Sequence, residues 1–291
     1  MMAGEFADRL MAARRHKRSA LVVGIDPQLD SAGAPGIPPG KTLAGFCCEI
    51  VEACADVALA VKPQLAFFEA RGLEGMRAFV EVLKTARRCG LPTIADAKRG
   101  DIGSTSAAYA EAFLGEGDFA CDAMTVNPYL GSDAIEPFLK RVRQGRGIFV
   151  LVKTSNPSSG EFQDRFAPER PLWEMVAARV HQWGGEMVGA SGLSSVGAVV
   201  GATYPQQAVR ARELMPHTIV LAPGLGAQGA SASDAVAAAH RDGSGVIVNA
   251  SRSVMYAFRE QAGTAPAQAA HAAAQTLRDE IEAALARIGK V

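Results

Sequence analysis

Eight short apolar segments recur along the chain, and they alternate with helix-like stretches. The apolar segments are 20–25, 58–61, 92–95, 121–126, 148–152, 198–202, 218–222 and 245–248. Most are apolar at consecutive positions, which is typical of parallel strands covered on both faces. Eight strand-then-helix units in 291 residues match a closed α/β barrel of the (β/α)₈ TIM type, whose usual length is about 250 residues. A doubly wound open sheet is the structural alternative, although it does not require eight strands.

The stretches between these segments have the length and apolar spacing of helices. We expect helices over 41–55, 67–88, 104–114, 133–143, 171–182, 205–214 and 233–241. A short N-terminal helix (about 5–17) and an extended, Ala-rich C-terminal helix (about 265–288) flank them. No change in composition marks a boundary, so the sequence predicts a single domain over residues 1–291. The interval 155–170 is either a lid over a site or a surface insertion.

The charge balance and the cysteine pattern exclude several classes of protein. Thirty Lys and Arg residues balance thirty Asp and Glu residues, so we expect no nucleic-acid partner. No window reaches the roughly 18 apolar residues of a membrane span, and the N-terminus lacks the apolar core of a signal peptide. The five cysteines show no metal-binding spacing. These observations favour a reduced cytoplasmic protein without a membrane partner.

Charged residues gather where the predicted strands end, which is where barrels place their active sites. Asp96 and Lys98 are two positions apart after the third strand, so their side chains point the same way. With Lys62 after the second strand and Asp101 beyond, they form a candidate array of alternating charge. Flanking carboxylates keep a lysine protonated, which favours a proton donor over an amine nucleophile. A rim ion-pair network without a chemical role stays open as the alternative.

A glycine-rich segment and an arginine suggest a second function at the same end of the barrel. The segment PGLGAQG (223–229), which contains Gly226 and Gln228, follows the seventh strand, and Arg252 follows the eighth. Loops after strands seven and eight often bind phosphate in barrels. Glycines let backbone N–H groups approach an anion, and arginine binds one bidentately. A plain turn beside a surface arginine is the alternative interpretation.

The segment DAKRGDIGST (96–105) resembles the orotidine 5′-phosphate decarboxylase family, whose pattern is D-x-K-x-x-D-I with a threonine three residues beyond. The resemblance extends over nearly the whole chain and is greatest to the longer bacterial branch of that family. It implies decarboxylation of orotidine 5′-phosphate to uridine 5′-phosphate, the last step of UMP synthesis. It also implies a cofactor-independent enzyme that needs no metal.

The resemblance also implies roles for the charged residues. Lys98 would protonate the C6 carbanion that loss of CO₂ leaves, while Asp96 and Asp101 orient Lys98 and Lys62 completes the array. The family enzyme is a homodimer. By resemblance, Asp101, Ile102 and Thr105 would therefore enter the active site of the partner subunit.

Further matches imply how the substrate is bound. By resemblance, Asp26 after the first strand would hold the ribose, and Ser155 after the fifth would contact the pyrimidine. Gln228 and Arg252 would bind the phosphate, beside Gly226 of the glycine-rich segment.

Two alternative functions follow from the same residues. Sister barrels that decarboxylate or condense sugar phosphates share D-x-K-x-x-D but use Mg²⁺, held by an acidic residue at the second strand end. Here that position is Lys62, a cation that repels a metal. A non-catalytic nucleotide-binding protein is the other alternative, although no position of the motif is lost.

Overall fold

The computed structural model describes residues 5–28, 36–225, 229–261 and 263–288, and its eight strands form one parallel sheet. The strands are β1 (Leu21–Ile25), β2 (Ala60–Pro63), β3 (Ile94–Arg99), β4 (Ala123–Val126), β5 (Gly147–Lys153), β6 (Ser194–Val200), β7 (Thr218–Pro223) and β8 (Val246–Ala250). Their order is β2-β1-β8-β7-β6-β5-β4-β3. Isolated parallel bridges between Val61 and Thr93 and between Gln64 and Asp96 join β2 to β3. The predicted closed barrel is thereby confirmed.

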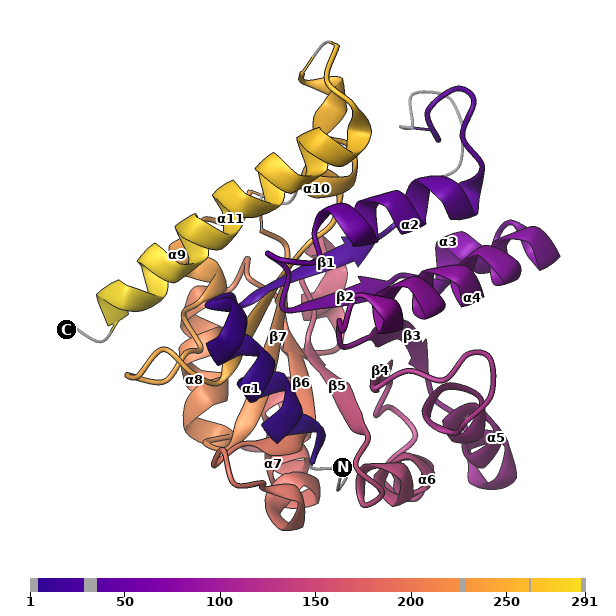
Figure 1. Ribbon diagram of the computed structural model, residues 1–291. Coiled ribbons are helices and arrows are strands. Elements are labelled where there is room, and N and C mark those ends of the chain that lie inside the picture. Colours follow the sequence, from indigo (N-terminus) through magenta and orange to yellow (C-terminus); the bar gives the residue numbers. More distant parts are fainter. Residues whose placement is uncertain (1–4, 29–35, 226–228, 262, 289–291) are drawn as a thin grey trace.

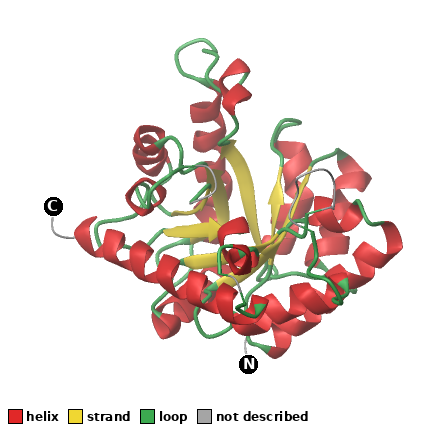
Figure 2. Ribbon diagram, turned by 90° about the horizontal axis from the view of Figure 1, so that it is seen from above, coloured by secondary structure: helices red, strands yellow, loops and turns green. Residues whose placement is uncertain are grey.

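Helices surround the strands on the outside of this barrel, as the view from above shows (Figure 2). They are α1 (Phe6–Lys17), α2 (Leu43–Ala53), α3 (Leu65–Glu69), α4 (Gly72–Arg88), α5 (Gly103–Leu114), α6 (Ser132–Val142), α7 (Leu172–Gly184), α8 (Pro205–Leu214), α9 (Ala232–Ala235), α10 (Arg252–Met255) and α11 (Pro266–Ile288). The strand segments are buried almost throughout, as continuous apolar runs in a parallel sheet should be.

Helix α1 closes the end of the barrel at which the strands begin (Figure 1). Its Phe6 and Leu10 side chains belong to the same buried cluster as inward-facing strand residues such as Phe149. The Phe6 and Phe149 rings meet edge to face, with centroids 6.1 Å apart. The backbone N–H of Ala7 donates to Ser195 Oγ at 3.1 Å. With this end closed, the opposite end of the strands is left for a ligand.

The Ala-rich helix α11 runs along the outside of the barrel beside α2 (Figure 1). Its buried face combines alanines such as Ala270 and Ala274 with Ile281 and Leu285. Small side chains allow the close approach of α2, whose C-terminal Cys54 donates its thiol to the Ala270 carbonyl. Across the described residues, no helix has both the length and the apolarity needed to cross a membrane.

The sixth strand lies earlier than the sequence predicts. We expected it at 198–202, whereas β6 spans Ser194–Val200. The prediction followed apolar residues, but the strand begins with two buried serines. Ser194 Oγ donates to the Gly184 carbonyl at 2.9 Å, and Ser195 Oγ accepts from Ala7. Partners distant in sequence therefore satisfy polar groups that appear unsuited to a buried strand.

Two predicted helices are shorter or divided. The segment 67–88 is split into α3 and α4, because Gly72 adopts a left-handed φ of 59° that interrupts the helix. The segment 233–241 was expected to be helical, but α9 ends at Ala235. Beyond it, Arg212 Nε donates a 2.8 Å hydrogen bond to the Ala238 carbonyl. In a longer helix that carbonyl would accept from a backbone N–H of the helix itself.

Candidate active site

A cavity of about 420 Å³ lies at the C-terminal ends of the strands. Seven of the eight strands contribute a charged, polar or glycine residue from the strand itself or from the residues just after it, and β6 contributes the apolar Val199. Its lining residues are Asp26, Lys62, Gln64, Asp96, Lys98, Thr125, Leu151, Thr154, Ser155, Asn156, Val199, Leu221, Pro223, Gly224, Leu225, Asn249, Ser251 and Arg252. This is the end at which (β/α)₈ barrels carry their chemistry.

Asp96 is the centre of a charge array at the base of the cavity. Its two carboxylate oxygens lie 2.5 Å from the ammonium nitrogens of Lys62 and Lys98, one on each oxygen. Gln64 Nε2 and Thr125 Oγ1 donate to the same carboxylate at 3.0 and 3.1 Å. The predicted Lys62–Asp96–Lys98 array is thus present within one chain, and its anion is fully hydrogen-bonded.

Burial and charge act against each other in this array. Burial by itself would raise the pKa of Asp96, but Lys62 and Lys98 outweigh it and hold that pKa far below its ordinary value. Burial would likewise lower the pKa of Lys62, but the carboxylates of Asp96 and Asp26 raise it above its ordinary value. Lys62 and Asp96 are therefore ionised across the whole range in which an enzyme works.

The backbone of Lys98 is left-handed, with a φ of 48°, which is uncommon for a residue other than glycine. Several contacts hold it there. Lys98 N donates to Thr125 Oγ1 at 2.9 Å, and the carbonyl of Arg99 accepts from Asn127 N at 2.8 Å. The Arg99 guanidinium pairs with Glu69. This conformation leaves the Lys98 side chain 45% exposed inside the cavity, where it can reach a ligand.

Two buried side-chain oxygens, one just after β1 and one in β8, have no hydrogen-bond partner within the described residues. They are Oδ1 of Asp26, just after β1, and Oδ1 of Asn249, in β8, whose side-chain amide donates to Ser251 Oγ at 3.2 Å. Burial raises the pKa of Asp26, although Lys62 opposes this shift. Because a buried acceptor without a donor costs about 1–3 kcal/mol, this side of the cavity suits a ligand that brings hydroxyl donors.

The predicted phosphate-binding residues are described only in part. Arg252, at the start of α10, lines the cavity together with Pro223, Gly224 and Leu225. Gly226 and Gln228 lie outside the described residues. Arg252 and the start of the glycine-rich segment thus lie at one cavity wall, and the roles of Gly226 and Gln228 stay predictions.

Three predicted site residues do not line the cavity of their own chain. Asp101 accepts a 2.7 Å hydrogen bond from the backbone N–H of Ile102, Ile102 is 58% exposed, and Thr105 is exposed on α5. The four-member array read from the spacing is therefore not completed by Asp101 within one chain. Asp26 is the second carboxylate that acts on Lys62 instead.

Sequence reasoning missed Gln64, Thr125 and Asn249. Each lies in or directly after a strand and points into the cavity. Placing the ends of β2, β4 and β8 correctly is the signal that would have found them. Ser155 was predicted, and it lines the cavity beside Thr154 and Asn156.

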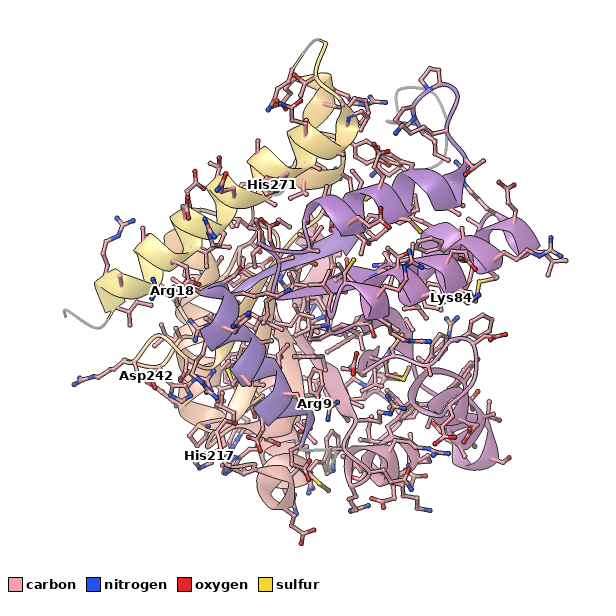
Figure 3. The ribbon with its side chains drawn as sticks, viewed as in Figure 1. Arg9, Arg18, Lys84, His217, Asp242 and His271 are labelled. Carbon is pink, nitrogen blue, oxygen red and sulfur yellow. The ribbon has the colours of Figure 1, made fainter. Side chains whose placement is uncertain are left out.

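The histidines lie away from the cavity. None of the five lines the cavity, and His217 and His271 lie on the outside of the barrel (Figure 3). Among the residues that the structure describes, no group of three or more His, Cys, Asp and Glu side chains is placed to hold a metal ion.

A closed barrel with a Lys–Asp–Lys array at its ligand-binding end defines a class, the (β/α)₈-barrel enzymes that act on a small anionic molecule. More particularly, the chain belongs to the orotidine 5′-phosphate decarboxylase / HUMPS family, whose model matches residues 19–267. It is 44% identical to the orotidine 5′-phosphate decarboxylase of Rhodopirellula baltica over 273 residues, 88% of this chain and 90% of that protein. Its identity to that of Deinococcus radiodurans is also 44%, over 98% of this chain and 99% of the relative. The structure of Leishmania donovani OMP decarboxylase superposes with a TM-score of 0.77 at 34% identity, covering 97% and 98% of the two chains.

Proposed function

We propose that this protein converts orotidine 5′-phosphate to uridine 5′-phosphate and CO₂ in UMP biosynthesis. The observation that carries the proposal is the Lys62–Asp96–Lys98 ion-pair array at the base of a cavity that Arg252 also lines. Family membership and the names of relatives matched over nearly their full length support it.

In the proposed mechanism Lys98 is the proton donor. The bond between C6 and the carboxylate breaks, CO₂ leaves, and the electron pair stays on C6. Lys98 Nζ then donates a proton to C6, which gives uridine 5′-phosphate, and the amine recovers a proton from solvent. Asp96 pairs with Lys98 Nζ at 2.5 Å and so holds the ammonium group in position until that step. The preorganised ammonium groups stabilise the developing carbanion without reorganisation of water.

The rest of the substrate would occupy the cavity walls. Asp26 and Asn249 accept hydrogen bonds from the ribose hydroxyls, since each carries a buried oxygen that finds no donor among the described residues. Arg252 pairs with the phosphate, together with Gly226 and Gln228, and Ser155 faces the pyrimidine. Binding energy from the remote phosphate lowers the barrier at the ring if it is realised only in the transition state.

We further propose a cytoplasmic homodimer in which Asp101, Ile102 and Thr105 enter the partner's site. Exposed apolar side chains support this assembly. Ile102 is 58% exposed, and Tyr129 and Leu130, which follow β4, are 82% and 47% exposed. Apolar groups so exposed near a site are typical of an interface. The five cysteines are free thiols, in keeping with a reducing compartment.

Decarboxylation in excess chelator tests the proposed function. We expect the ultraviolet absorbance of orotidine 5′-phosphate to fall when the purified protein is added with chelator. A requirement for added Mg²⁺ would instead favour a sugar-phosphate barrel of the sister type. That alternative is not favoured, because Lys62 stands where the sister barrels carry an acidic metal ligand, and both oxygens of Asp96 already pair with ammonium groups.

Replacement of Lys98 tests the mechanism separately. Lys98→Ala should abolish turnover while phosphate-dependent binding of uridine 5′-phosphate largely survives, because Arg252 is untouched. Near-normal turnover by this variant would remove Lys98 from the role of proton donor. Loss of binding and turnover together would point to a role in the architecture of the site.

A further inference from the structure

One buried ammonium lies outside the cavity and takes no part in the proposed mechanism. Lys153 is the last residue of β5, and its side chain is completely buried. Its Nζ donates to both carboxylate oxygens of Asp164 at 2.9 Å and to Ser159 Oγ at 3.1 Å. The same ammonium lies 4.9 Å from the centre of the Tyr204 ring. A charge this deeply buried is tolerated only when it is so completely partnered.

The partners of Lys153 show what this ion pair holds. Ser159 and Asp164 both belong to the segment 154–171 between β5 and α7, which contains the interval 155–170 that the sequence leaves as either a lid or an insertion. Asp164 is 43% exposed, so it lies at the outer edge of the segment. Lys153 therefore fastens the middle of this segment to the end of its own strand.

A second set of hydrogen bonds connects this ion pair to the cavity wall. Gln163, the neighbour of Asp164, accepts from Thr154 N at 3.0 Å and donates to Thr154 Oγ1 at 2.7 Å. Thr154 Oγ1 donates in turn to Asn156 Oδ1 at 2.7 Å. A displacement of Asp164 would therefore be transmitted to Thr154 and Asn156.

The other side of the segment is also tightly constrained. Gly201, which follows β6, lies so close to Ser155 that a Cβ added to the glycine would be 2.8 Å from the Ser155 Cβ. Ser155 is thus held between the end of β6 and the network on Lys153. Thr154, Ser155 and Asn156 all line the cavity.

We propose that Lys153 is a positioning residue whose ion pair with Asp164 sets the cavity wall formed by Thr154, Ser155 and Asn156 against the ring of the bound nucleotide. The proposal rests on the proposed function, because it assumes that the ligand carries a pyrimidine ring. Lys153 itself touches no substrate. Its effect is confined to the base-facing wall and leaves the phosphate-facing wall at Arg252 unchanged.

The first experiment separates the two walls. In Lys153→Met we expect kcat/KM for orotidine 5′-phosphate to fall about 100-fold, the loss typical of a misplaced contact. Inhibition by uridine 5′-phosphate should weaken about 10-fold, while inhibition by ribose 5-phosphate, which lacks the ring, should change less than about 2-fold. Equal weakening of both inhibitors, or an unchanged kcat/KM, would overturn the proposal.

Lys84→Met is the matched control. Lys84 lies on the outer face of α4 (Figure 3), where it pairs with Glu81 at 2.9 Å and is 52% exposed. This variant removes the same ammonium and one ion pair far from the cavity, so its kinetics should equal those of the wild type. If it loses activity as Lys153→Met does, the loss is not specific to the wall.

The second experiment asks whether Lys153 acts through Ser155. We expect the losses in kcat/KM from Lys153→Met and Ser155→Ala to be non-additive, so that the double variant is little worse than the poorer single one. Losses that multiply would overturn the proposal. If Lys153→Met does not fold, Asp164→Asn at the exposed end of the pair provides the same cycle. Absence of turnover in the wild type would contradict the proposed function instead.

Discussion

At the scale of single residues, two nearby side chains of β3 differ in how far they are exposed and bonded. Asp96 is buried and saturated with donors, whereas Lys98 is left partly free by its left-handed backbone. A strained backbone conformation of this kind persists only when several surrounding contacts hold it in place. Here the Thr125 hydroxyl and the Arg99–Glu69 pair supply those contacts.

Asp96→Asn removes the anion between the two ammonium groups. Lys62, whose side chain is 4% exposed, would then keep a buried charge without a carboxylate partner on β3. We expect a loss of at least about 3 kcal/mol in the free energy of unfolding and at least a 100-fold loss of turnover, roughly the effect of removing a preorganised charge. Urea unfolding and the decarboxylation assay measure the two effects. Asp118→Asn, at an exposed position, is the control, and equal stability of the two variants would contradict this account.

The residues of the site could be predicted from the sequence to the extent that charge reveals them. Asp26, Lys62, Asp96 and Lys98 were found because charged residue types stand out at the ends of apolar runs, and all four line the cavity. Neutral polar residues do not stand out in this way. Asn249 becomes a candidate only when its buried oxygen is seen to lack a donor among the residues that the structure describes.

At the scale of elements, the placement of strands depends on partners that a linear pattern does not contain. Apolar runs locate β1 and β7 closely, because nearly every residue of those strands is apolar. The start of β6 could not be found in this way, since Ser194 and Ser195 are matched by Gly184 and by Ala7 of α1. The end of α9 depends on Arg212 of α8, again a contact between elements.

The fit of α1 into the barrel can be tested with a double-mutant cycle. A Cβ added at Gly147 would lie 2.2 Å from the Phe6 ring, so Gly147→Ala should destabilise the protein by about 1–3 kcal/mol. Phe6→Ala alone should cost about 3–5 kcal/mol by leaving a cavity. In the double variant the methyl group added by Gly147→Ala occupies the space that the Phe6 ring leaves, so the two losses of stability should not add. Strict additivity in chemical denaturation would show that α1 does not rest on Gly147.

His240, in the turn before β8, should make the stability of the protein depend on pH. Burial lowers the pKa of His240 below its ordinary 6.5, and the nearby charges of Arg212 and His217 add to burial while Asp242 opposes it. As the pH falls, His240 therefore binds a proton in the unfolded chain near its ordinary pKa of about 6.5, and in the folded chain only at a lower pH. Stability is present above the unfolded pKa and is lost as the pH falls towards the lower pKa of the folded state.

The melting temperature between about pH 8 and pH 5.5 measures this dependence. His240→Gln should lose less stability on acidification than the wild type, because glutamine binds no proton. His16→Gln, at an exposed position on α1, should behave as the wild type does. An identical pH dependence in all three proteins would rule out His240 as the cause.

At the scale of the whole molecule, the proposed homodimer makes a strong prediction. Lys98→Ala and Asp101→Ala subunits should each be inactive alone, but a mixed dimer contains one site with both defects and one with neither. We therefore expect activity to return on mixing and re-association, to about a quarter of the wild-type value if subunits combine at random. Heterodimers verified by differential tagging yet inactive would contradict a site shared between subunits.

The junction between β2 and β3 gives the charge array a second consequence. These strands are joined by isolated bridges, one of which links Gln64 to Asp96, and the Lys62–Asp96 ion pair crosses the same gap. The Asp96 carboxylate therefore also belongs to the seam of the cylinder. A nucleotide that binds Lys62 and Asp96 at once adds a non-covalent tie across that seam. We expect the protein to resist local opening most strongly while its substrate is in place.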